Sequence, residues 1–221
     1  MCLSRISYPG TVARWEPDAR GRLLRAALEL FTERGYDATT AAQIADRAGL
    51  TKTTLFRLFT DKREILFQGQ PALVAIATTA VETAGEDLTP HDVLRVVVQA
   101  LCDAHTSDQQ EIGRSIGLLV ASTPELQERT AFKRASITAA LEAALTDRLA
   151  DRHLAGLLAD IGMRSYYEGF TSWTGEGPDT RLEDVVFREL DAIDQVMPQL
   201  AGHNHTVLHS AGTADATRPA P

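Results

Sequence analysis

The side chains best suited to chemistry in this sequence lie close together at residues 51–57. Lys52, Thr53 and Arg57 point outward from a short predicted helix whose apolar residues face the other way. Ammonium, guanidinium and hydroxyl groups donate hydrogen bonds to phosphate oxygens and to base edges in the DNA major groove. The cluster therefore suits a DNA groove, although in an arbitrary helix the same residues more often form only a solvated face.

Motifs typical of enzymes do not occur in the sequence. It has no Gly-rich phosphate loop, HExxH, GxSxG or paired-carboxylate motif, and its six histidines lack partners at fixed spacing. We therefore expect no enzyme and no cofactor. Near the end of the chain, His203, His205 and His209 have no carboxylate or thiol cluster beside them, which favours a solvated tail over a metal site.

Two short helices joined by a tight turn must position the outward cluster. Thr40 and Gln43 form a capping box that begins the first helix, and Gly49 suits the left-handed conformation that ends it. Thr51 caps the second helix. The inward-facing residues of that helix recur at three- and four-residue spacing and are Leu55, Leu58 and Phe59.

These residues lie in the stretch TAAQIADRAGLTKTTLFRLF, which resembles the helix-turn-helix of the TetR family of bacterial transcription regulators. The flanking sequences LLRAALELFTERGYDATT and FTDKREILF are similar to the family's first helix and to the start of its fourth, so the resemblance covers about residues 20–67. It implies a DNA-binding head, a homodimer and a small-molecule effector. Many members have a tyrosine with a phosphate-binding hydroxyl where this chain has Phe56, and that contact is lost here.

The resemblance and the helix register together assign a set of DNA contacts. The hydroxyls of Thr39 and Thr40 can meet a phosphate beside a helix N-terminus, although capping alone also explains Thr40. Lys62 follows the capping residue Asp61 and can reach a phosphate at the next helix N-terminus. The predicted DNA-binding residues are Thr40, Thr51, Lys52, Thr53, Thr54, Phe56, Arg57 and Lys62.

The composition is that of an ordinary water-soluble chain. Of its 221 residues 44% are hydrophobic and 24% charged, and no run of about 18 uncharged apolar residues occurs. Since no apolar signal core follows the first basic residues, we expect a cytoplasmic protein. The net charge is −8, yet residues 14–64 hold ten Lys or Arg against eight Asp or Glu, so a basic head is attached to an acidic remainder.

We predict an all-α chain in four segments. They are a flexible arm at residues 1–16, a TetR-type helix-turn-helix domain at 17–67, a helical ligand-binding and dimerisation body at 68–200, and a disordered tail at 201–221. A helix from Lys62 to about Thr83, bent near Pro71, is expected to link the head to the body. One helix is expected to begin at Pro90 and another to cover about residues 107–121, and both are expected to be buried on much of their surface. Three more are expected at about residues 124–150, 153–174 and 182–200.

The last two predicted helices suit a dimer interface. Glycines along the first would permit close approach of a neighbouring helix, and apolar residues of the second form a seam. In the resembled family the equivalent helices form a symmetric four-helix bundle. The predicted interface residues are Gly156, Gly162, Gly169, Leu182, Val186, Leu190, Ile193 and Met197.

The body is larger than dimerisation requires, which indicates a cavity for a small molecule. Aromatic side chains with a thioether and a few polar groups form a usual wall for such a site, although the same residues at helical spacing also make a plain core. The predicted ligand-binding residues are Leu101, Cys102, His105, Arg114, Leu118, Phe132, Met163, Tyr166, Tyr167, Phe170 and Trp173. Redox sensing by Cys102 is a weaker hypothesis, because nothing near it in the sequence would lower the pKa of its thiol.

Two functions from different classes remain open. The first is a transcription regulator, expected to be a repressor, whose dimer binds a palindromic operator and releases it when a small apolar or amphipathic molecule occupies the body. The second is a protein-interaction adaptor whose DNA-binding head is secondary or vestigial. The outward positions of Lys52, Thr53 and Arg57 favour the first.

Overall fold

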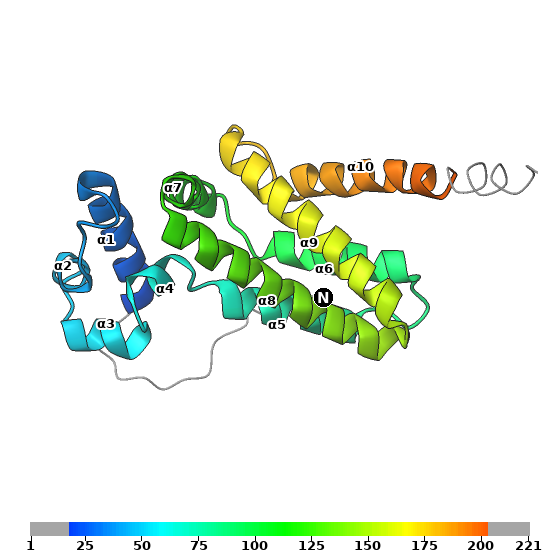
Figure 1. Cartoon of the computed structure of the whole chain (residues 1–221), viewed down its shortest axis with the longest axis horizontal. Coiled ribbons are helices and arrows are strands. Elements are labelled where there is room, and N and C mark those ends of the chain that lie inside the picture. Colours follow the sequence, from blue (N-terminus) through cyan, green and yellow to red (C-terminus); the bar gives the residue numbers. More distant parts are fainter. Residues whose placement is uncertain (1–17, 203–221) are drawn as a thin grey trace, which may run out of the picture. The chain divides into compact units, whose positions relative to one another are not determined.

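A computed structural model describes residues 18–202 of the chain, with side chains up to Gln199. Within that range it contains ten helices and no strand, so the predicted all-α fold is confirmed (Figure 1). The predicted arm and most of the predicted tail, including its three histidines, lie outside the described residues.

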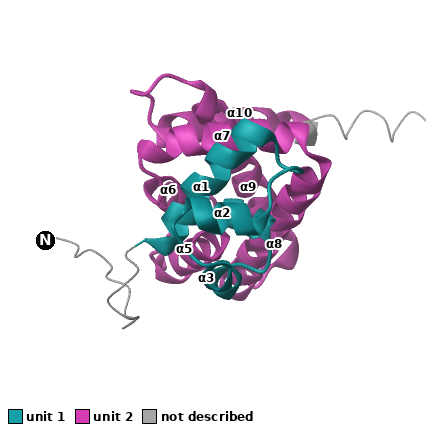
Figure 2. Ribbon diagram, turned by 90° about the vertical axis from the view of Figure 1, so that its left-hand side faces the viewer, with its two compact units in different colours: residues 1–68 teal, residues 69–221 magenta. Residues whose placement is uncertain are grey.

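The chain divides into two compact units, Met1–Gln68 and Gly69–Pro221 (Figure 2). The helices of the first unit are α1 (Ala19–Arg34), α2 (Ala41–Arg47), α3 (Lys52–Leu58) and α4 (Lys62–Leu66). Those of the second unit are α5 (Gln70–Thr83), α6 (Pro90–Asp103), α7 (Asp108–Ser122), α8 (Pro124–Leu149), α9 (Arg152–Gly175) and α10 (Leu182–Gly202).

The first unit packs around the inner face of α1. Leu23, Leu30 and Phe31 are at most 2% exposed, which confirms the inward stripe that the apolar spacing of this helix predicts. α2 and α3 each add a fully buried side chain, Ile44 and Leu55. These contacts give the short helices a stability that seven residues alone would not provide.

The helix expected to run from Lys62 to Thr83 is two separate helices. α4 ends at Leu66 and α5 begins at Gln70, so residues 67–69 interrupt the helix before Pro71. Pro71 lies in the first turn of α5, where its missing N–H has no intrahelical acceptor to lose. The prediction of one bent helix was wrong, because a proline at this position begins a helix rather than bending one.

The second unit is built around α6, α8 and α9. α9 packs along α8 and α10, while α6 packs against α5 and α9 (Figure 1). The predicted apolar face of α6 is buried, and its members are Val93, Leu94, Val97, Val98, Leu101 and Cys102. The core continues into α8 and α9 through Leu141, Leu145, Ala155 and Ala159, all fully buried.

α7 is much less buried than α6. Gln110 is its one buried residue, and Leu118 is 69% exposed. The other apolar side chains of this helix are half-buried; they are Ile112, Ile116, Leu119 and Val120. The expectation that this helix is buried on much of its surface was therefore wrong, because its contacts with α8 and α9 leave its apolar side chains only partly covered.

Two glycines allow α9 to approach its neighbours within the same chain. A Cβ atom at Gly162 would collide with Leu94 of α6, and one at Gly169 would lie 2.6 Å from the Cα atom of Val186 in α10. The close approach that these glycines predict thus occurs inside one chain.

No helix in residues 18–202 is long and apolar enough to span a membrane.

Candidate nucleic-acid interface

Local hydrogen bonds build α2, α3 and the turn between them. The Gln43 N–H donates to Thr40 Oγ1 over 3.3 Å, and the Thr40 N–H donates to Gln43 Oε1 over 2.8 Å, so the predicted capping box is present. Gly49 has φ +66°, the left-handed conformation expected of it. The Thr54 N–H donates to Thr51 Oγ1 over 3.0 Å and begins α3.

Two arginines tie this pair of helices to α1. Arg22 Nη2 donates to the backbone oxygens of Ala48 and Gly49 at the turn. Arg47, the last residue of α2, bonds Glu29 over 3.0 Å and Glu33 over 2.9 Å. The bond to Arg47 holds the pKa of Glu33 below its ordinary value. Together these contacts fix α3 relative to α1.

Sequence reasoning missed both arginines. The partners of Arg22 and Arg47 lie between 14 and 27 residues away along the chain, and no short motif marks such pairs. The bidentate fork of Arg47 toward Glu33 becomes visible only when α1 and α2 are packed.

α3 presents the predicted contact residues to solvent. Leu55 is fully buried and anchors the helix, whereas Lys52, Thr53 and Arg57 are exposed and Phe56 is 46% exposed. The Lys52 ammonium lies 5.6 Å from the centre of the Phe56 ring, which holds it on this face. The face combines an ammonium, a guanidinium and a hydroxyl with an apolar ring, a combination that suits phosphate and base-edge contacts.

The threonine hydroxyls of this region differ in their hydrogen-bond partners and in their exposure. Those of Thr51 and Thr54 lie 3.0 Å apart and bond to each other, and Thr40 is exposed at the start of α2. Thr39 is 1% exposed, and its hydroxyl donates to the backbone oxygen of Gly35 over 2.8 Å. The expectation that Thr39 faces a phosphate was wrong, because its hydroxyl is satisfied inside the first unit.

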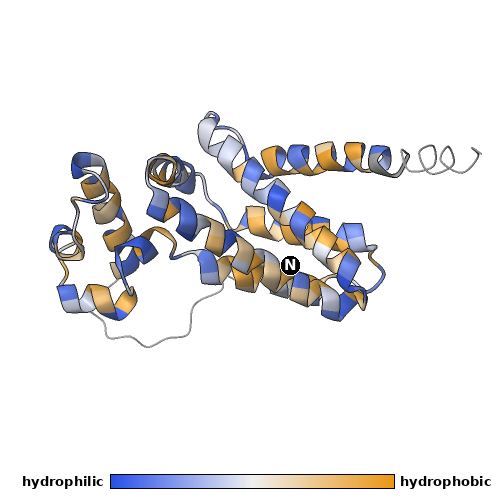
Figure 3. Ribbon diagram, in the orientation of Figure 1, coloured by the Kyte–Doolittle hydropathy of each residue, from blue (hydrophilic) through white to orange (hydrophobic). Residues whose placement is uncertain are grey.

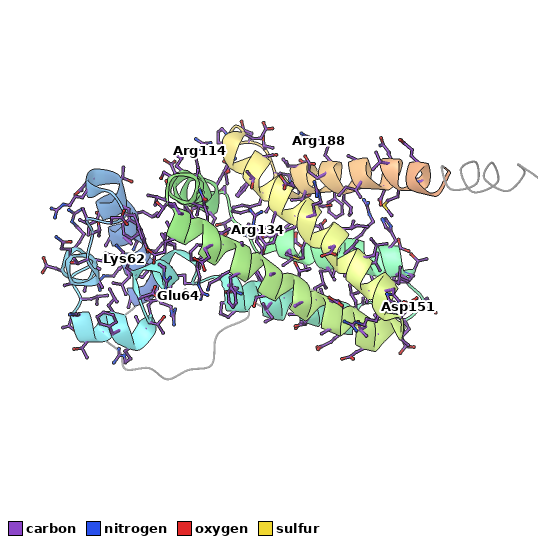
Figure 4. The ribbon with its side chains drawn as sticks, viewed as in Figure 1. Lys62, Glu64, Arg114, Arg134, Asp151 and Arg188 are labelled. Atoms are coloured by element: carbon purple, nitrogen blue, oxygen red, sulfur yellow. The ribbon has the colours of Figure 1, made fainter. Side chains whose placement is uncertain are left out.

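Lys62 opens α4 after the predicted cap, Asp61. Its ammonium donates to the backbone oxygens of Tyr36 and Thr39 over 2.7 and 3.0 Å, and lies 4.0 Å from the centre of the Tyr36 ring (Figure 4). The side chain is half-buried. Lys62 therefore closes the loop between α1 and α2, and its contact with a phosphate stays a prediction.

Five of the predicted ligand-binding residues belong to the packed core of the second unit. They are Leu101, Cys102, Met163, Tyr166 and Trp173, each at most 4% exposed. Half-buried His105, Tyr167 and Phe170 join Tyr166 in an aromatic cluster whose neighbouring ring centroids lie 5.2 to 6.2 Å apart. We call these four residues the aromatic cluster.

Hydrogen bonds fix the proton of His105 in this cluster. Burial lowers the pKa of His105, so its ring is neutral at neutral pH. Nδ1 lies 3.0 Å from the backbone oxygen of Leu101 and must donate to it. Nε2 then accepts from the Tyr166 hydroxyl over 3.3 Å, and burial raises the pKa of that phenol, which keeps its proton.

The other three predicted ligand-binding residues lie at the surface. Leu118 and Phe132 are 69% and 60% exposed. Arg114 is exposed and donates from Nε to the backbone oxygen of Thr174 over 2.6 Å, which caps the end of α9 (Figure 4). Helical spacing groups residues on a face but does not decide which face meets the core.

The thiol of Cys102 is poorly suited to redox sensing. Burial, helped by the negative charges of Asp103 and Glu183, raises the pKa of this thiol to about 12. A thiol with that pKa is almost fully protonated at neutral pH, and the thiolate is the reactive form.

The predicted dimer residues fall into two groups. Leu182, Val186 and Leu190 are at most 6% exposed within the single chain, where they pack the first half of α10 onto α9. Ile193 and Met197 are half-buried, and apolar positions continue along the second half of α10 (Figure 3). Gly156 faces Glu142, because a Cβ atom there would lie 3.6 Å from its Oε1 atom.

A groove of about 340 Å³ runs between α9 and the second half of α10. Its lining consists of Arg164, Ser165, Glu168, Glu189, Ala192, Ile193 and Val196. Val196 is 48% exposed. The dimer interface stays a prediction, and this groove and the second half of α10 are surfaces that a partner could cover.

Known proteins match this chain in sequence and in fold. The family model described as bacterial regulatory proteins, tetR family, matches residues 23–68. The transcriptional regulator TcmR of Streptomyces glaucescens is 28% identical over 206 residues, which cover 87% of this chain and 88% of TcmR. The transcriptional activator FasR of Mycolicibacterium smegmatis is 36% identical over 94 residues, but the match covers 42% of this chain and 43% of FasR.

Among solved structures, the fatty acid degradation regulator FadR from Bacillus halodurans aligns with a TM-score of 0.52 at 15% identity, covering 78% of this chain and 96% of that one. At this identity the likeness concerns the fold. The matched residues 23–68 coincide with the described helix-turn-helix and its neighbours α1 and α4.

Proposed function

Because the chain belongs to the TetR family of transcriptional regulators, we propose that it is a repressor that binds a palindromic operator as a homodimer and leaves it when a small amphipathic molecule binds the second unit. The observation that carries this proposal is the face of α3. A fully buried Leu55 anchors the helix while Lys52, Thr53 and Arg57 remain exposed on it.

The assigned roles follow from what each group can reach. Arg57 and Lys52 read base edges or phosphates, Thr53 adds a hydroxyl, and Phe56 lies against the sugar-phosphate backbone. Thr40 and Thr51 stand at helix N-termini, where an oxygen of the DNA backbone can accept backbone N–H bonds. Arg22 and Arg47 position α3 without touching DNA.

The dimer follows from the way such helices read DNA. A two-fold pair of recognition helices enters successive major grooves about 34 Å apart, so the operator repeats the symmetry of the protein. The groove between α9 and α10 and the exposed Val196 support a partner at this end of the second unit.

Selection from a pool of random duplex DNA tests the proposal, because the protein itself then picks out the sequence that it binds. We expect an enriched sequence with two inverted half-sites. Arg57→Ala should then weaken binding to that sequence by about 1–3 kcal/mol, with a smaller loss on unrelated DNA. Arg34→Ala removes an exposed guanidinium from the last turn of α1 and is the matched control.

Fluorescence anisotropy at fixed salt measures both variants. An equal loss on selected and unrelated DNA would remove Arg57 from base reading. If the pool yields no enriched sequence at all, the protein-interaction adaptor becomes the better hypothesis.

A further inference from the structure

The guanidinium of Arg134 in α8 has a buried donor without a hydrogen-bond partner among the described residues, unlike the guanidinium groups of three other arginines in the second unit. Arg114 and Arg148 donate to backbone oxygens at helix ends, and Arg95 pairs with Asp191. The Nε atom of Arg134 is buried and has no hydrogen-bond partner among the described residues. Buried polar atoms of folded proteins are nearly always bonded, so this donor calls for a partner that the described residues do not supply.

The ring of Tyr167 lies beneath this guanidinium. The Cζ atom of Arg134 is 4.4 Å from the ring centre, where α8 passes α9 (Figure 4). Burial raises the pKa of Tyr167 to about 12 although the charge of Arg134 opposes this rise. The phenol is therefore neutral and brings no negative charge to the guanidinium above it.

Part of each side chain around this guanidinium is open to the surface, because Arg134, Tyr167 and Phe170 are each half-buried. The Nε atom itself is covered, so a ligand that bonds it must displace the side chains over it. α7 covers the same part of α9, since a Cβ atom at Gly113 would lie 2.9 Å from the ring of Phe170.

α7 is fixed at one end and loosely packed at the other. In its first half, Gln110 donates to the backbone oxygen of Trp173 over 2.7 Å, and Arg114 bonds that of Thr174. Its second half carries half-buried Ile116, Leu119 and Val120 and the exposed Leu118. Apolar side chains that are only partly covered supply the wall that an apolar skeleton needs.

We propose that the ligand of the second unit is an organic anion with an apolar skeleton, whose acidic group bonds Arg134. The skeleton lies against Tyr167, Phe170 and the apolar side of α7. A carboxylate or sulfonate accepts two parallel hydrogen bonds from Nε and one terminal nitrogen of a guanidinium, which satisfies the buried donor. This inference rests on the proposed ligand response and names its ligand class.

Two dyes that share one skeleton test the anion requirement on the full chain. The probe is 8-anilinonaphthalene-1-sulfonate, and the control dye is N-phenyl-1-naphthylamine, which lacks the sulfonate. We expect the wild-type chain to bind the sulfonate more tightly, as measured by fluorescence titration. Dodecanoate should compete with the sulfonate dye, whereas dodecanol should compete much less.

Substitutions locate the effect at Arg134. Arg134→Met keeps an apolar stem over Tyr167 and should weaken binding of the sulfonate dye by about ten- to a hundredfold, while the neutral dye binds as before. Arg134→Lys keeps the charge but loses the paired donors and should fall between. The control is Arg129→Met on the same helix, where the guanidinium lies 5.1 Å from the ring of exposed Phe132.

Equal affinity of the wild-type chain for the two dyes, or an unchanged sulfonate affinity in Arg134→Met, overturns the inference. If Arg134→Met does not fold, the Arg134→Lys variant and the competition between dodecanoate and dodecanol decide it. Failure of the proposed function is a separate result, since it would show as the lack of a selected DNA sequence while the dyes still distinguish Arg134 from Arg129.

Discussion

The guanidinium of Arg22 lies 3.3 Å from the backbone oxygen of Gly49, so α1 holds the turn in front of α3, the proposed recognition helix. Gly49 has φ +66°, and a Cβ atom there would lie 2.9 Å from Arg22 Nη2. The lack of a Cβ atom at Gly49 thus has two effects. It permits the left-handed turn, and it leaves room for the arginine that fixes it.

Gly49→Ala should therefore harm both stability and DNA binding. The left-handed conformation costs a residue with a Cβ about 1–2 kcal/mol, and displacement of Arg22 loosens α3 in addition. Urea unfolding measures the first effect and anisotropy on the selected DNA the second. Gly117→Ala is the control, because that glycine has open space around it in α7 and alanine is the better helix former. A Gly49→Ala variant as stable as the wild type would show that the turn relaxes.

Lys62→Met should destabilise the first unit by removing the bonds to the backbone oxygens of Tyr36 and Thr39. Two hydrogen bonds from a charged donor and one contact with the Tyr36 ring are lost, for a cost of about 2–4 kcal/mol. DNA binding should weaken to a similar extent on selected and unrelated sequences.

The salt dependence of DNA binding separates the two roles of Lys62. Removal of a phosphate contact lowers the slope of log K against log salt by about 1. Because Lys62 is predicted to contact a phosphate as well as the loop, we expect both a reduced slope and a lower melting temperature, whereas an unchanged slope would leave Lys62 its role in the loop alone. A slope reduced by one at full stability would instead place Lys62 on a phosphate alone.

Local signals of the first unit could be predicted from the sequence. The capping box of Thr40, the left-handed Gly49 and the cap Thr51 each depend on residues within four positions, and all three are present. Thr39 was mispredicted because its hydroxyl bonds Gly35, and nothing in the spacing tells an inward hydroxyl from an outward one.

In the second unit, the sequence could not predict which surface covers each apolar residue, because the partners lie far apart along the chain. The apolar stripe of α10 was visible, but an apolar residue does not reveal whether its own chain or a second copy covers it. Val186 proved to pack on Gly169 of α9. Similarly, Leu118 and Phe132 share helical spacing with core residues, yet the packing of α7 and α8 leaves both exposed.

Val196→Asp should convert the proposed dimer to a monomer. Val196 is 48% exposed in the single chain, so the aspartate is tolerated there, whereas in a symmetric interface two copies of the charge would be buried together. Sedimentation velocity measures whether each variant is a dimer or a monomer. Val96→Asp on α6, where the valine is 38% exposed, is the matched control and should remain dimeric. Val186→Asp tests stability rather than assembly, because Val186 is fully buried within one chain.

An intact dimer in Val196→Asp would move the interface away from the second half of α10. A monomer in both Val196→Asp and Val96→Asp would show that added charge alone, and not its position, disrupts assembly.

The last prediction concerns the coupling between DNA binding and small-molecule binding in the proposed regulator. A molecule that releases DNA must bind the released state more tightly by the coupling free energy, typically about 1–3 kcal/mol, and DNA must weaken binding of that molecule by the same factor. Trp173 reports on the second unit, because its ring lies 5.6 Å from Phe170 and its Nε1 donates to the backbone oxygen of Thr180 over 2.8 Å. We expect an anionic amphipath that perturbs Trp173 fluorescence to lower the affinity for the selected DNA about 5- to 150-fold. Calorimetric titration of the same amphipath, with and without that DNA, should return the same factor. Equal amphipath affinities in the two titrations would mean that the second unit binds the molecule without controlling DNA.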